Sequence, residues 1–191
     1  MKLFLVRHGQ TVANRDQFYA SQSNVPLTEQ GRQEAAAIRP ILEGFCFDRV
    51  YSSDLTRAID TQRIALPDAV AETTPLLREI DVGTLTGKSF TEVRVMQGTD
   101  SFLRRDFIAY GGENMDMLCS RIRSFLSVLE TEKCENVVAF THGGTLTAML
   151  RVVLGADFNY SAVFSHNCSI HVYEYDGVKW RLLAWNYMGK L

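Results

Sequence analysis

Short apolar runs alternate with longer segments of helical spacing along this chain, and that alternation constrains its fold more than any other feature. The apolar runs are typical of strands, and the segments between them are typical of helices. The expected strands are residues 2–6 (KLFLV), 47–53 (FDRVYSS) and 135–140 (ENVVAF). One helix is expected directly after Thr28, and three more are expected at residues 55–66, 113–133 and 145–154. This alternation predicts an α/β three-layer sandwich, in which helices flank both faces of a mostly parallel central sheet.

Local signals mark where several elements begin and end. Thr28 and Asp54 are suitable N-caps for the helices that follow them, because a short polar side chain accepts a hydrogen bond from a free backbone N–H group. Pro67 ends the second of these helices, since proline cannot continue it. Near the C-terminus, two strand-like runs flank the turn sequence DGV at 176–178, so we expect a C-terminal β-hairpin.

Residues 83–112 fit the alternation least well, because glycines at positions 83, 87, 98, 111 and 112 interrupt the segment. Irregular segments of this kind lie at the surface and often carry function. We therefore expect a small cap or lid insertion here. Residues 1–191 as a whole are expected to form a single domain, because this length suits one hydrophobic core.

Composition argues against several classes of function. With 20 basic and 22 acidic residues the formal net charge is −2, which gives no broad positive field for nucleic acid or an anionic membrane. The apolar runs are shorter than the roughly 20 residues of a membrane span, and the first run is too short for a secretory signal. The four cysteines form no CxxC pair and suggest no metal. We expect a cytoplasmic protein, a monomer or a homodimer, that binds neither nucleic acid nor membrane.

Two of the four histidines follow expected strands and precede glycine. The sequence RHG at 7–9 comes after the first strand, and HGG at 142–144 comes after the strand that ends at Phe140. Ligands of open α/β sheets bind at the carboxyl ends of the strands, so we expect both histidines at one such edge. A glycine beside each lets an oxyanion approach the backbone, which makes Gly143 a candidate substrate contact.

The residues around His8 favour phosphoryl chemistry. The neighbouring positive charge of Arg7 favours the neutral imidazole, which is the nucleophilic form. Guanidinium groups suit the charged oxygens of a transferring phosphoryl group, and Arg57 supplies a second one from the first turn of a helix. Taken alone, Arg57 would equally suit an exposed helical charge. Together these residues predict that His8 attacks a phosphoryl group.

Five motifs, in this order, are similar to those of one known family. They are RHGQT at 7–11 with Asn14, PLT at 26–28 with Gly31, SDL at 53–55 with Arg57, LREI at 77–80, and THGG at 141–144. The set resembles the histidine phosphatase superfamily, the phosphoglycerate mutase-like group, from residue 3 to about residue 154. The chain departs from many relatives at residues 21–24 (SQSN), where a glycine and an aspartate are usual. Ser21 is therefore a candidate substrate contact whose equivalent differs in those relatives.

The resemblance implies a role for each matching residue. His8 would be phosphorylated transiently, in a phosphate pocket formed by Arg7, Arg57 and His142. A further hydrogen-bond donor, Asn14, would complete that pocket.

Expelling an alkoxide is difficult, so the chemistry also needs an acid within reach of the leaving oxygen. The resemblance assigns that role to Glu79. Asp81 is an alternative, because alternate residues of an extended segment share a face.

These motifs leave the phosphoryl acceptor open. Water makes the enzyme a phosphatase acting on a small phosphorylated metabolite, which the compact segment after Glu79 favours over the longer glycolytic mutases. The alternative is phosphoglycerate mutase-type transfer, and only that alternative needs a cofactor, a 2,3-bisphosphoglycerate primer. A non-catalytic phosphate-binding protein would be expected to lack His8 or its surrounding residues.

Two further features bear on the substrate. Arg104 and Arg105 resemble a paired arginine with which mutases hold a second anionic group, although two solvated charges would give the same pattern. If the pair faces the pocket, the substrate carries a carboxylate or another phosphate. His166 follows the recognised motifs and is a candidate for the pocket rim.

Overall fold

The computed structural model describes residues 1–155 and 163–189, apart from the side chains of residues 99–104. In this part of the chain, six strands form one sheet in the order β3-β2-β4-β1-β5-β6. The strands are β1 (Lys2–Arg7), β2 (Arg49–Ser53), β3 (Glu72–Thr74), β4 (Asn136–Thr141), β5 (Ile170–Tyr175) and β6 (Trp180–Tyr187). Strands β3, β2, β4 and β1 are mutually parallel. Strand β5 pairs antiparallel with β1 on one side and with β6 on the other. The mostly parallel sheet and the C-terminal hairpin are thereby confirmed.

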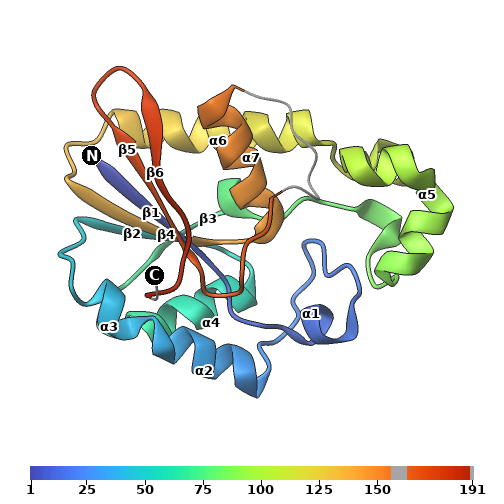
Figure 1. Cartoon of the computed structure of the whole chain (residues 1–191), viewed down its shortest axis with the longest axis horizontal. Coiled ribbons are helices and arrows are strands. Elements are labelled where there is room, and N and C mark those ends of the chain that lie inside the picture. Colours follow the sequence, from blue (N-terminus) through green and yellow to red (C-terminus); the bar gives the residue numbers. More distant parts are fainter. Residues whose placement is uncertain (156–162, 190–191) are drawn as a thin grey trace.

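Helices cover both faces of this sheet (Figure 1). Their bounds are α1 (Val12–Asp16), α2 (Glu29–Ala37), α3 (Arg39–Leu42), α4 (Thr56–Ala65), α5 (Phe90–Arg104), α6 (Met115–Glu130) and α7 (Gly143–Leu154). Helices α2, α3 and α4 lie on one face, and α6 and α7 lie on the other. The predicted three-layer α/β sandwich is confirmed.

The central strands are apolar on both faces, because successive side chains of a strand point to opposite sides. In β1, Leu3 and Leu5 pack with residues of α6 and α7. Phe4 and Val6 pack instead with residues of α2 and α4. A strand buried on both faces reads as a continuous apolar run, which is why KLFLV indicated the sheet so clearly.

One predicted cap is present and one is wrong. Thr28 caps α2, its hydroxyl accepting from the Gly31 amide at 3.1 Å. Asp54 does not cap α4, which begins after Leu55 without a side-chain cap. Both carboxylate oxygens of Asp54 instead accept from the Arg78 guanidinium, at 2.8 and 2.6 Å. This two-bond ion pair outweighs a capping bond, since charge-assisted hydrogen bonds are the stronger kind.

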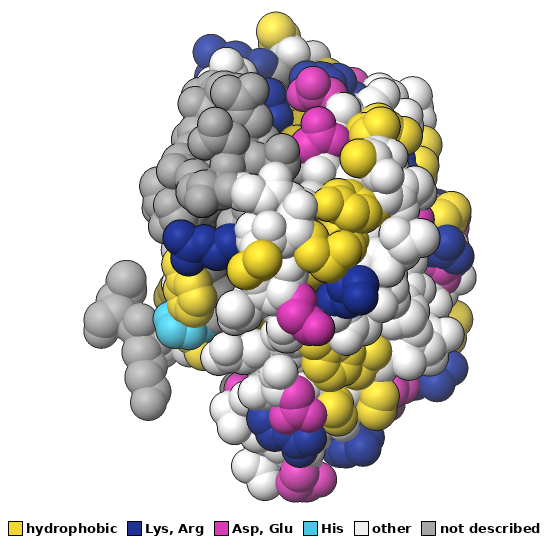
Figure 2. Space-filling model, turned by 90° about the vertical axis from the view of Figure 1, so that its right-hand side faces the viewer, with side chains coloured by type: hydrophobic (Ala, Val, Ile, Leu, Met, Phe, Trp, Pro, Cys, Tyr) yellow, Lys and Arg dark blue, Asp and Glu magenta, His cyan; other side chains and the backbone are white. Residues whose placement is uncertain are grey.

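Residues 83–112 hold more regular structure than their glycines suggested. They contain α5, which is kinked at Gly98 (φ 72°), and two 3₁₀ turns at Gly83–Leu85 and Ile108–Tyr110. The segment projects beyond the sheet, to the right in Figure 1. Figure 2 looks onto this side of the molecule and shows apolar side chains gathered across it. Among the described residues, every helix is too short or too polar to cross a membrane.

Candidate active site

The two histidines meet at the carboxyl edge of the sheet, as their positions after β1 and β4 predicted. These strands are parallel neighbours in a register that pairs Arg7 with Thr141. The His8 amide donates to the Thr141 carbonyl at 2.9 Å. The ring centroids of His8 and His142 lie 5.1 Å apart. The strand order therefore brings together two motifs more than 100 residues apart in sequence.

The His8 imidazole has a defined tautomer. Its Nδ1 lies 2.8 Å from the Gly9 carbonyl oxygen, which can only accept a hydrogen bond. Nδ1 therefore carries the proton, and Nε2 keeps its lone pair. The ring is almost fully buried and forms part of the cavity lining. This is the arrangement that a nucleophilic imidazole requires.

The surroundings of His8 keep it uncharged. Burial is the largest cause that moves its pKa well below the ordinary 6.5, followed by the positive charges of Arg57 and then Arg7. Each disfavours an imidazolium, burial through lost solvation and the arginines through repulsion. The neutral ring is therefore maintained below neutral pH as well as above it.

His142 lies behind Arg57 and outside the cavity lining. Its Nδ1 accepts from Nε of Arg57 at 3.1 Å, so Nε2 carries the proton and donates to the Ser53 hydroxyl at 2.8 Å. The ring is fully buried, and burial together with Arg57 holds its pKa well below 6.5. His142 thus orients a guanidinium and packs near the His8 ring.

Among the residues that the structure describes, Arg57 is one of three arginines that line the cavity. It is 1% exposed, and its terminal nitrogens donate to the carbonyls of Ser21 and Ser23 at 2.8 and 2.9 Å. Burial lowers its pKa to about 10, so it remains charged at neutral pH. The interpretation of Arg57 as an exposed helical charge is therefore wrong, because the first turn of α4 faces inward.

Arg7 supplies a second guanidinium, and one of its donors is unsatisfied. A terminal nitrogen donates to the Ser165 carbonyl. Its Nε is buried and has no hydrogen-bond partner among the described residues. A Cβ built at Gly143 would lie 3.5 Å from this Nε, which places the donor beside the start of α7. An unpaired buried donor costs free energy that a bound anion recovers, and helix N-termini favour anions.

Asn14 is held in one orientation by its neighbours. Its Oδ1 accepts from the Thr11 amide and hydroxyl at 3.0 and 2.9 Å. The side-chain amide of Asn167 also donates to this oxygen, at 3.4 Å, and to the His8 carbonyl at 2.9 Å. Asn14 lines the cavity, and with its oxygen occupied its N–H₂ group is the part of the side chain left to bind a ligand. A second donor for an anion is thereby provided.

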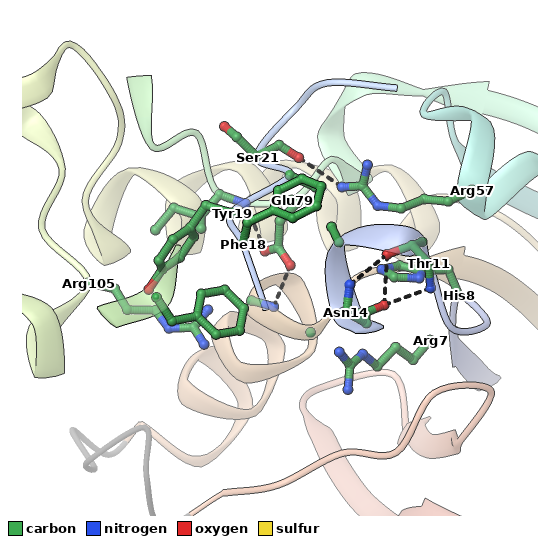
Figure 3. A pocket seen from close by; sticks show the side chains of 16 residues that line it. Arg7, His8, Thr11, Asn14, Phe18, Tyr19, Ser21, Arg57, Glu79 and Arg105 are labelled. Carbon is green, nitrogen blue, oxygen red and sulfur yellow. Dashed lines mark hydrogen bonds between the residues drawn. The ribbon is translucent and has the colours of Figure 1, made fainter. Parts of the chain in front are cut away.

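The Glu79 carboxylate lies on backbone amides at the cavity wall. Oε1 accepts from the Ile80 amide at 2.8 Å, and Oε2 accepts from the Gly144 amide at 3.1 Å. In Figure 3 it lies between Tyr19 and the guanidinium of Arg57. This is a position from which a carboxyl group can reach a leaving oxygen.

Asp81 points elsewhere. Its Oδ1 accepts from the Ser21 hydroxyl at 3.1 Å and from the Gly83 amide at 2.8 Å. Ser21 also accepts from the Val82 amide at 2.9 Å. Its hydroxyl therefore makes hydrogen bonds within the protein, although the residue lines the cavity. The carboxyl group facing the cavity is that of Glu79.

One cavity of about 270 Å³ brings most of the predicted residues together (Figure 3). Its lining includes Arg7, His8, Asn14, Ser21, Arg57, Glu79, Arg105 and Gly143. The side chain of Arg104 lies outside the described residues. His166 is exposed and lies outside this lining, with its ring against Phe164. Within the described residues there is no group of three or more potential metal ligands.

Several residues at the site were missed by sequence reasoning. Arg121 of α6 donates to the carbonyls of Leu76 and Arg78 at 3.0 Å each, and to that of Glu79 at 3.2 Å. Asn167 fixes Asn14 as described above, and Phe90 lines the cavity. Their sequence neighbourhoods carry no signal that separates them from ordinary surface residues.

Comparison with known proteins places this geometry in a family. The family model of the histidine phosphatase superfamily, branch 1, matches residues 3–188. The chain belongs to the histidine phosphatase superfamily. As a member of this superfamily it is an enzyme of the phosphoric monoester hydrolase type.

Individual relatives within the superfamily have different activities. The adenosylcobalamin/α-ribazole phosphatase of Escherichia coli is 28% identical, with 81% of this chain and 80% of that protein covered. The 2,3-bisphosphoglycerate-dependent phosphoglycerate mutase 2 of Gloeobacter violaceus is 34% identical, with 78% and 73% covered. A mycobacterial glucosyl-3-phosphoglycerate phosphatase, solved with VO3, has a TM-score of 0.86 at 27% identity, covering 97% of this chain and 98% of that one.

Proposed function

We propose that this enzyme hydrolyses a small-molecule phosphate monoester in two steps. Nε2 of His8 attacks phosphorus and the bond to the ester oxygen breaks, while Glu79 gives its proton to that oxygen. Water then attacks the phosphohistidine, Glu79 takes a proton from the water, and inorganic phosphate leaves. Arg7, Arg57 and Asn14 hold the phosphoryl oxygens, and His142 orients Arg57.

The proposal rests on one observation above all. A buried, neutral imidazole with a free Nε2 lone pair lines the same cavity as the guanidiniums of Arg7 and Arg57. Positive groups aimed at the phosphoryl oxygens stabilise the charge that develops in the transition state, and they do so most strongly away from water. The unpaired Nε of Arg7 supports this assignment, since a phosphoryl oxygen would satisfy it.

Hydrolysis is proposed rather than transfer to a second substrate. Relatives include both phosphatases and a mutase, so relatedness alone leaves the acceptor open. The compact segment between Glu79 and α6 supports water as the acceptor. We further propose that the enzyme works in the cytoplasm on a small metabolite, without a metal ion and without binding nucleic acid or membrane.

A direct experiment tests the nucleophile. Wild type should turn over p-nitrophenyl phosphate, with EDTA present or absent, and His8→Ala should not. Mass spectrometry of reactions quenched without acid should find one phosphate on His8. His166→Ala is the matched control, because this exposed histidine lies outside the cavity lining and its loss should leave turnover intact. An active His8→Ala enzyme with no adduct in wild type would overturn the proposal.

A second measurement separates hydrolysis from transfer. Release of inorganic phosphate from 3-phosphoglycerate or other monoesters, without isomerisation, is expected of a phosphatase. Isomerisation that depends on 2,3-bisphosphoglycerate would establish the mutase alternative.

A further inference from the structure

We infer that the alcohol part of the substrate carries a flat, apolar ring, and that Phe18, Tyr19 and Phe90 bind this ring. The inference rests on the proposed function, because it assumes that the phosphoryl group lies at His8. It concerns the part of the same cavity that binds the group that leaves.

The cavity lining includes aromatic as well as charged side chains. Phe18, Tyr19 and Phe90 line it together with His8, Arg57 and Arg105. Figure 3 shows Glu79 between Tyr19 and Arg57. A monoester bound with its phosphoryl group at His8 and its ester oxygen near Glu79 therefore directs its alcohol toward the aromatic side chains.

Backbone hydrogen bonds hold these aromatic residues in place. The Tyr19 amide donates to the Lys88 carbonyl at 3.0 Å, and the Gly87 amide donates to the Tyr19 carbonyl at 2.8 Å. The Phe90 amide donates to the Gln17 carbonyl at 3.0 Å. The segment after α1 and the segment before α5 are thus joined along the cavity. The aromatic wall formed by Phe18, Tyr19 and Phe90 is preorganised, which lowers the entropy cost of binding.

The packing of the wall leaves one ring open. Tyr19 packs edge-on against Phe90, with centroids 4.8 Å apart, and against the buried Phe107 at 5.8 Å. Phe90 lies at the end of this cluster and is 38% exposed. An exposed aromatic ring beside a cavity gains from an apolar partner, and aromatic pairs favour the offset or edge-on contacts already seen here.

The cationic group nearest this wall is Arg105, which lies beside the proposed general acid. A Cβ built at Gly144 would lie 3.1 Å from a terminal nitrogen of Arg105 and 2.1 Å from Oε1 of Glu79. The Arg105 guanidinium and the Glu79 carboxyl group therefore both lie beside Gly144.

The test compares phosphate esters that differ only in the ring. Phenylpropyl phosphate and propyl phosphate have similar leaving alcohols, so their kcat/KM ratio reports binding of the ring. We expect wild type to favour the phenylpropyl ester by about tenfold or more. The ratio should fall to within about threefold in Phe18→Ala and Phe90→Ala. Phe90→Leu is the milder replacement if truncation impairs folding, and it should lower the ratio partly.

Phe45→Ala is the matched control. Phe45 is 42% exposed, much like Phe90, and packs against Phe4 on the far side of the sheet from α6. This variant should keep the wild-type ratio.

The remaining outcomes show whether the inference about the ring or the proposed function itself has failed. Equal kcat/KM for the two esters, preference for 3-phosphoglycerate, or a ratio that survives both alanine variants would overturn the inference and leave the phosphatase proposal standing. No turnover of any ester and no phosphate on His8 would overturn the proposed function itself.

Discussion

The Gly144 amide donates a 3.1 Å hydrogen bond to Oε2 of Glu79. The other carboxylate oxygen, Oε1, lies close to the position that a Cβ would take at residue 144. A Cβ at position 144 would come within 2.1 Å of that oxygen. The second glycine of the HGG motif is therefore explained by the carboxylate that rests on it. At Gly143 the nearest atom to a Cβ would be Arg7 Cζ, at an ordinary 3.5 Å.

Gly144→Ala should displace Glu79 from the leaving oxygen. Loss of a positioned acid typically costs about a hundredfold or more in rate, and it matters only where the leaving group needs a proton. We expect a large loss of kcat/KM on propyl phosphate and a small one on p-nitrophenyl phosphate, whose leaving group departs unprotonated. We compare kcat/KM because kcat also includes the attack of water on phosphohistidine, which is common to both esters. Gly143→Ala, compared on the same two esters, should not discriminate between them. Equal losses of Gly144→Ala on both esters would contradict a role for Gly144 in placing Glu79.

Arg121 should matter for the same step, although it lies behind Glu79. Its guanidinium donates to the Glu79 carbonyl and pairs with Glu113 at 2.8 Å, and Glu113 in turn accepts from the Asp81 amide at 2.9 Å. The backbone on both sides of Ile80 is thus held by one ion pair. Arg121→Gln should lower kcat/KM on propyl phosphate by roughly tenfold to a hundredfold, and much less on p-nitrophenyl phosphate.

Arg123→Gln is the control for this variant, because Arg123 lies on the exposed side of the same helix. Unfolding in urea should separate stability from catalysis. Arg121→Gln should lose roughly 2 kcal/mol, since the side chain of Glu113 is only 15% exposed and loses its charged partner. If the two esters are affected equally, Arg121 contributes to folding alone.

The sequence located the residues around His8 because neighbouring parallel strands end together. The apolar runs of β1 and β4 were long and uninterrupted, and each led directly into a histidine and a glycine. Any order that places these strands side by side brings their carboxyl ends to one edge. The burial of Arg57 followed from the same logic once β2 was found beside β4.

Other features depended on contacts that no local pattern announces. Arg121 reaches the Arg78 carbonyl across 43 residues, and its helix has several other charged positions of similar appearance. Asp54 had good capping chemistry, but a guanidinium 24 residues away bound it instead. Helix α5 was not predicted because it contains Gly98, which the helix accommodates at a kink. These outcomes were decided by tertiary contacts, which outweigh local propensity.

Buried neutral histidines should make the protein sensitive to mild acid. The pKa values of His8, His142 and His171 all lie below the ordinary 6.5, and burial brings that of His171 to about 3. Above pH 6.5 both folded and unfolded chains hold these rings neutral, so stability is complete. As the pH falls below 6.5 the unfolded chain takes up protons that the folded chain refuses, and the free energy of unfolding declines.

Each of these histidines should contribute about 1.4 kcal/mol per pH unit. Urea unfolding between about pH 5 and 6.5 measures the slope, in a range above that where the aspartates titrate. In His171→Gln, which removes a ring bonded to Ser169 and outside the cavity lining, the slope should fall by roughly a third. A flat free energy across this range would contradict the assignment of buried, neutral rings.

Arg57 should set the acid limit of catalysis through its charge. After burial, its positive charge is the largest cause of the lowered His8 pKa, so Arg57→Gln should raise that pKa and protonate the nucleophile at a higher pH. Arg57→Lys keeps the charge while losing the planar fork, and both variants should be slower than wild type by about a hundredfold. The pH profile of kcat/KM on p-nitrophenyl phosphate separates them, because ionisation of the substrate is common to all three enzymes. The acid limb should move upward in Arg57→Gln alone. Coincident limbs in the two variants would show that burial and Arg7 keep His8 neutral without the charge of Arg57.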